Sequence, residues 1–157
     1  NELFARLVLE INQAGLSWTT MLKKWQGFYR AYAEFDIATV AAFTETDVAR
    51  LLADASIIRN RLKVQAAVYN AQQILLLQQE YGSFKAWLDH HHPLDKEAWV
   101  KLFKKQFKFV GGEIVNEFLM STGYLAGAHD ADCPVLSQVL VSKPLFAQIP
   151  KQDDTPC

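Results

Sequence analysis

The chain has 157 residues, a formal net charge of −1 at pH 7 and 50% hydrophobic residues. It is therefore long enough for one domain with a substantial core and too apolar to be disordered. No apolar run approaches the roughly 20 residues that a membrane span needs, and the net charge gives no general attraction to nucleic acid. Cys133 and Cys157 are the two cysteines, too few for a disulfide framework, so we expect a reducing, cytoplasmic setting and no membrane partner.

In the first half of the chain, apolar residues recur every three or four positions and predict a first helix that ends at about Gln13. Gly15 interrupts this pattern, and Ser17 is a typical N-cap for a second helix over residues 18–32. Asp36 precedes a short helix at 37–42. A capping-box pattern, Thr44 to Asp47, precedes another at 48–52.

In the second half, a long helix is predicted from residue 60 or 61 to residue 80, and N-cap residues precede helices at 84–90 and 96–105. A short apolar turn at 107–112 leads into a helix at 113–121 that Gly123 ends, and a last short helix covers 135–141. No strand alternation persists. The sequence therefore predicts an all-α fold, with several short helices in a single-domain bundle.

The segment from Trp99 to Gly123 has the pattern of a helix-hairpin-helix motif. Gly111 and Gly112 would let a DNA phosphate approach backbone N–H groups at the positive end of the second helix, and several lysines, among them Lys108, flank the turn. An ordinary helical hairpin with a glycine turn is the alternative. The other clusters of basic residues, at 23–24 and 59–63, are each typical of solvated helix faces.

Two groups of residues are candidate metal ligands. His129 and Cys133 have a spacing that lets both face one zinc ion. Structural zinc usually takes four ligands, so for these two residues alone a chance pairing is favoured over a zinc site. The run His90–His92 lies at a predicted helix end, where the helix dipole favours imidazoles without any metal.

Glu10 lies at the edge of the apolar stripe of the first helix, where a partly buried carboxylate needs either a partner or a function. It could be a boundary residue paired with an arginine or lysine. Trp18, just beyond the Gly15 turn, could be a core residue. From the residues alone these alternatives stay open.

Three ordered stretches, "LEINQAGLSWTTMLKK", "ASIIRNRLKVQAAVYNA" and "FKFVGGEIVNEFLMSTGYLAGAHDADC", together resemble the DNA-3-methyladenine glycosylase I family. The likeness runs from about Leu3 to Cys133. It implies a helix-hairpin-helix glycosylase domain at residues 1–145, followed by a polar tail at 146–157. The implied activity is hydrolysis of the N-glycosidic bond of 3-methyladenine in double-stranded DNA by a monomeric, monofunctional enzyme.

The resemblance also implies roles for individual residues. Glu10 matches the glutamate that recognises the lesion and is the candidate catalytic residue, and Trp18 matches an aromatic residue that contacts the flipped base. The residues implied to contact DNA are Gln13, Gly15 and Leu16, which wedge into the duplex, and Lys108, Gly111 and Gly112 of the hairpin. His129 and Cys133 match two of the four ligands of a structural zinc.

The chain also departs from the family pattern. The N-terminal segment with the other two zinc ligands and further pocket aromatics is not in this sequence, so we expect an incomplete zinc site and an incomplete base pocket. Gln106 replaces a common glycine before the hairpin, and only Glu113 and Glu117 occur where many helix-hairpin-helix glycosylases have a catalytic aspartate. The alternative functions are a non-catalytic DNA-binding module and a helical protein-interaction domain.

Overall fold

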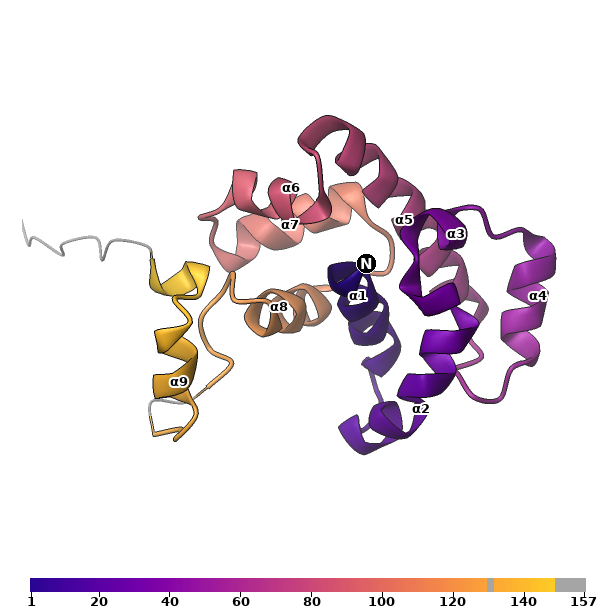
Figure 1. Ribbon diagram of the computed structural model, residues 1–157, viewed down its shortest axis with the longest axis horizontal. Coiled ribbons are helices and arrows are strands. Elements are labelled where there is room, and N and C mark those ends of the chain that lie inside the picture. The colour runs from indigo at the N-terminus through magenta and orange to yellow at the C-terminus, as the bar shows by residue number, and fades with distance from the viewer. Residues whose placement is uncertain (130–131, 149–157) are drawn as a thin grey trace, which may run out of the picture.

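The computed structural model describes residues 1–129 and 132–148, and within these ranges it contains helices and no strands. Helix α1 (Glu2–Gln13) lies in the middle, with α2 to α5 on one side and α6 to α8 on the other (Figure 1). The remaining elements are α2 (Trp18–Ala31), η1 (Ala33–Phe35), α3 (Ile37–Ala41), α4 (Glu45–Ala53), α5 (Arg61–Tyr81), α6 (Phe84–His91), α7 (Lys96–Gln106), α8 (Gly112–Ser121), α9 (Leu136–Val141) and η2 (Leu145–Ala147). The predicted all-α, single-domain fold is confirmed.

Local capping determines where most helices begin. Ser17, Asp36, Asn60, Ser83 and Asp95 each accept a backbone N–H bond in the first turn of the helix that follows. The prediction that α4 begins at residue 48 is wrong by three residues. The capping box of Thr44 and Asp47 makes Thr44 the N-cap, so the helix begins at the next residue.

The core forms around one face of α1. Phe4, Leu7 and Ile11 repeat at helical spacing and are completely buried. They pack within a cluster rich in aromatic residues, which includes Phe28, Tyr32, Phe35, Trp99, Phe103 and Phe118. Because α1 contacts α2, α5 and α8, this packing fixes the positions of the helices that surround it.

The short turn η1 was not predicted. Ala33, Glu34 and Phe35 have φ angles of 50°, 56° and 57°, a left-handed conformation that costs roughly 1–2 kcal/mol for each residue with a side chain. The turn places the Phe35 ring 6.0 Å from Tyr32 and 6.0 Å from Trp25, measured between ring centroids. Burial of Phe35 and its contacts with these two rings offset the backbone strain.

The C-terminal part of the chain packs loosely, since neither α9 nor η2 contains a buried residue. The predicted domain boundary at residue 145 falls within η2, and most of the predicted tail lies outside the described residues. Across the described ranges, no helix is both long enough and apolar enough to cross a membrane.

Candidate functional site

A cavity of about 610 Å³ opens between α1, α2 and the C-terminal end of α8. Glu10 and Gln13 line it from α1, and Trp18 lines it from α2, so the structure brings these three predicted residues together. The other lining residues are Glu2, Ala5, Arg6, Leu9, Met21, Leu22, Trp25 and Ser121. The walls are thus mainly apolar and aromatic, with a few charged groups, which is the usual composition of a ligand-binding pocket.

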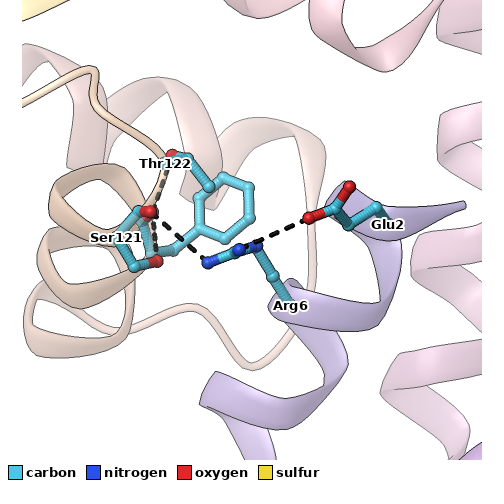
Figure 2. A network of polar contacts seen from close by, with 5 residues as sticks. Glu2, Arg6, Ser121 and Thr122 are labelled. Carbon is cyan, nitrogen blue, oxygen red and sulfur yellow. Dashed lines mark hydrogen bonds and ion pairs between the residues drawn. The ribbon is translucent and has the colours of Figure 1, made fainter. Parts of the chain in front are cut away.

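Glu10 is half-buried in this cavity and forms no ion pair with any of the described residues. Burial raises the pKa of its carboxyl group and the nearby Glu117 raises it further, whereas Arg6 lowers it. Arg6 instead donates to Glu2 Oε1 at 3.3 Å and to the Ser121 carbonyl oxygen at 3.4 Å (Figure 2). The structure therefore does not support the alternative of a boundary glutamate neutralised by a basic partner.

Trp18 is not a core residue, because 59% of it is exposed. Met21, Leu22, Trp25 and Tyr29 lie at helical spacing on one side of the same helix, but only Met21 is buried. The rest of that side faces the cavity and solvent, with the Trp25 and Tyr29 rings stacked at 6.3 Å. An indole face is consequently available to a flat ligand that enters beside Glu10.

The turn between α1 and α2, residues 13–17, adjoins the cavity through Gln13, and we call it the wedge turn. The Leu16 N–H donates to the Gln13 carbonyl oxygen at 2.7 Å, and Gly15 has φ +83°, which favours glycine. A Cβ at Gly15 would meet no atom within 4 Å, and Leu16 is 39% exposed. The three predicted wedge residues therefore lie together at this turn, with Gly15 and Leu16 exposed.

The predicted hairpin turn at 107–112 lies between α7 and α8. In the structure it covers residues 107–111, because α8 begins at Gly112, one residue earlier than predicted. Asn70 of α5 fixes it: its Nδ2 donates to the Lys108 carbonyl oxygen at 3.1 Å, and the Lys108 N–H donates to its Oδ1 at 2.8 Å. The Lys108 ammonium lies 4.1 Å from the Tyr69 ring centroid. Asn70 was not among the predicted site residues, although an amide at a buried position of a long helix is a signal for such a contact.

The two glycines at the junction of the hairpin turn and α8 have ordinary backbone angles. Gly111 is the N-cap of α8 and provides no side-chain acceptor for its first N–H groups, and Gly112 is the first helical residue. A Cβ added at either glycine would meet nothing within 4 Å. The fold itself does not require glycine here, because the space beside both Cα atoms is open.

The predicted basic cluster at 59–63 is not a uniform solvated face. Arg59 and Arg61 are exposed, and Arg61 pairs with Glu45 at 3.3 Å. Lys63 is instead only 7% exposed, because it points back under the wedge turn. Gln106, where the family pattern has glycine, ends α7 and donates to Gln73 of α5 at 3.1 Å.

The candidate metal ligands are partly brought together. His129 Nδ1 and Cys133 Sγ lie 3.4 Å apart, close to the roughly 3.5 Å expected for two ligands of one tetrahedral zinc. In the part of the chain that the structure describes, no group of three potential ligands occurs, and Cys157 lies outside it. In the run His90–His92, His90 and His91 pack against Tyr81, and His91 Nδ1 contacts the Trp87 carbonyl oxygen at 2.9 Å.

Comparison with known proteins agrees with this architecture. Residues 1–100 match the model of the methyladenine glycosylase family. DNA-3-methyladenine glycosylase 1 of Escherichia coli K12 is 36% identical over 151 residues, which cover 84% of this chain and 80% of that protein. A crystal structure of 3-methyladenine DNA glycosylase I superposes with a TM-score of 0.75 at 34% identity, covering 85% of this chain and 83% of the other.

A second solved structure, a 3-methyladenine DNA glycosylase I variant in complex with 3-methyladenine, gives a TM-score of 0.72 at 34% identity and covers 85% of this chain and 81% of its own. The fold and the pocket together define the class of all-α DNA glycosylases. Within that class, the chain belongs to the methyladenine glycosylase family.

Proposed function

We propose that this chain is a DNA repair glycosylase that hydrolyses the N-glycosidic bond of 3-methyladenine in double-stranded DNA. One observation supports this most directly: an unpaired, half-buried carboxylate, Glu10, shares a mainly apolar cavity with exposed indole rings. The names of the relatives, 3-methyladenine DNA glycosylases, give the same substrate.

Charge explains how such a pocket selects its base. 3-Methyladenine in DNA is cationic, whereas adenine is neutral, so the Glu10 carboxylate and the face of Trp18 both favour the lesion. Glu117 adds negative potential near Glu10, and the ties of Arg6 to Glu2 and to the Ser121 carbonyl keep its guanidinium from pairing with Glu10. The base must leave the stack to reach this site, which costs a few kcal/mol.

The chemistry needs little from the protein once the base is bound. When the bond between the base and C1′ breaks, its electron pair goes to the base nitrogen, and the cationic base leaves as a neutral molecule. Water adds its oxygen to C1′ and releases one proton, so no acid has to protonate the leaving group. We assign Glu10 to recognition of the base and to electrostatic stabilisation of the positive charge that passes to the sugar.

The two loops provide the contacts with DNA. On the wedge turn, Leu16, which is exposed, and Gln13, which lines the cavity, would fill the gap that the extruded base leaves in the duplex. At the hairpin turn, the open N–H groups of α8 at Gly111 and Gly112 and the Lys108 ammonium would contact phosphates without reading sequence. Because all these groups come from one chain, we propose that a monomer is sufficient.

A structural zinc is part of the same proposal. His129 and Cys133 fit two corners of a tetrahedral site, and two further ligands would have to come from elsewhere in the protein. When bound, such an ion would fix the loop after α8 and would take no part in hydrolysis.

Release of free 3-methyladenine from methylated duplex DNA tests this function. Replacing Glu10 by glutamine keeps the shape of the side chain but removes its charge, and a hydrogen bond to a charged group contributes about 1.5–3 kcal/mol. We therefore expect Glu10→Gln to slow single-turnover excision roughly 10- to 150-fold and to reduce discrimination against adenine. Glu80→Gln, at an exposed position that does not line the cavity, is the matched control.

The other outcomes identify the alternatives. Duplex binding without release by the unaltered protein would indicate a non-catalytic DNA-binding module. Neither binding nor release would favour a protein-interaction domain, and full activity of Glu10→Gln would refute the assignment of Glu10.

A further inference from the structure

Lys63, near the start of α5, is a buried cation without an acidic partner among the described residues. Its side-chain ammonium donates to the carbonyl oxygens of Asn12 and Ala14, each at 3.3 Å. It also lies 5.9 Å from the ring centroid of Phe109. These three contacts reach two segments that are nearly one hundred positions apart in the sequence.

Burial of an ammonium group without a counter-charge is costly, and burial accordingly lowers the pKa of Lys63. The two carbonyl groups lie at and just beyond the C-terminal end of α1, the negative end of its dipole, and offset part of that cost. An apolar side chain of similar length would fill the same space without that penalty, but it would leave both carbonyl groups without their donor. Packing alone therefore does not account for a lysine at this position.

The contacts of Lys63 join the two loops that the proposed function assigns to DNA. Ala14 belongs to the wedge turn, and Phe109 belongs to the hairpin turn. Asn70 holds the hairpin turn from the same helix, one heptad further along, through its two bonds to the backbone of Lys108. Helix α5 thus provides a rigid support to which both turns are fixed.

We propose that Lys63 is a positioning residue, which holds the wedge turn and the hairpin turn in a fixed relation so that they engage the duplex as one unit. This inference rests on the proposed function, because it assumes that both turns contact DNA. It predicts that the two turns are energetically coupled when DNA binds, and that the coupling depends on Lys63.

A double-mutant cycle measures this coupling. The ligand is a duplex with a tetrahydrofuran abasic-site analogue, and the variants are Leu16→Ala in the wedge turn, Gly112→Ala at the hairpin, and both together. In the otherwise unaltered protein, we expect their combined loss of affinity to differ from the product of the single losses by at least about threefold. In the Lys63→Met background the two losses should multiply independently.

Two controls make the result decisive. Lys85→Met removes an exposed lysine on α6 that pairs with Asp89, and it should leave the coupling unchanged. Phe109→Leu removes the aromatic ring beside Lys63 and should weaken the coupling. Because Phe109 is 42% exposed, this variant should fold even if Lys63→Met does not, so the test remains usable.

The outcomes separate this inference from the proposed function. Independent losses in the unaltered protein, or coupling that survives both Lys63→Met and Phe109→Leu, would overturn the positioning role while DNA binding stands. A protein that does not bind the abasic-site duplex at all would instead contradict the proposed function.

Discussion

Replacing Gly112 by alanine should stabilise the fold and weaken DNA binding at the same time. Gly112 is the first residue of α8, has an ordinary φ, and has no atom within 4 Å of the place where a Cβ would lie. An alanine in such a position stabilises a protein by about 0.4–1 kcal/mol, because the unfolded chain loses conformational freedom. In a chain of this size that corresponds to a rise in melting temperature of roughly 1–4 °C.

The effect on DNA binding has the opposite sign. If a phosphate lies against the N-terminal N–H groups of α8, the new methyl group occupies part of the space that the phosphate needs. Because a backbone N–H carries no net charge, loss of one such contact should leave the salt dependence of binding nearly unchanged. It should weaken duplex binding roughly tenfold, since a hydrogen bond to a charged group contributes about 1.5 kcal/mol or more.

Thermal unfolding and a salt titration of duplex binding, measured on the same preparation, test both halves. Unchanged affinity together with the expected stabilisation would show that no phosphate approaches Gly112, and the hairpin would then be an ordinary helical connection. A lower melting temperature would mean that the space at this residue is not open.

Two further predictions concern the pocket and its supports. Excision needs ionised Glu10, so kcat/KM should fall as the pH drops through the raised pKa of that residue, which gives the pH profile an acid limb. Glu117→Gln removes a like charge and should move this limb to lower pH, whereas Arg6→Gln removes an opposite charge and should move it to higher pH. Profiles of kcat/KM against pH would measure both shifts. If neither substitution changes the pH of the acid limb, ionisation of Glu10 is not its origin. Gly27→Ala would place a Cβ 2.4 Å from the Ser56 carbonyl oxygen, and urea unfolding should show a loss of about 1–3 kcal/mol. Stability equal to that of the unaltered protein would mean that α2 can shift freely against the loop at residue 56.

Much of the fold could be predicted because its signals are local. The N-cap residues Ser17, Ser83 and Asp95 each lie within three residues of the N–H group that they bind, so the sequence alone places the helix starts. Gly123 ends α8 for a similarly local reason, with φ +81°. The left-handed turn at 33–35 could not be predicted, because its strain is offset by contacts with residues elsewhere in the fold.

The candidate site divides in the same way. The paired glycines were predicted from their spacing, whereas the roles of Glu10, Trp18 and the wedge turn came from the resemblance to the family. Only the tertiary structure decided three further features of the site. Glu10 lacks a basic partner, the indole of Trp18 is exposed, and Lys63 is buried beside two turns that are far apart in the sequence. Exposure and charge pairing depend on which helix packs against each face, and those contacts join residues far apart in the chain. The sequence by itself therefore determined the helices and the family pattern, and packing decided which side chains remain free to meet DNA.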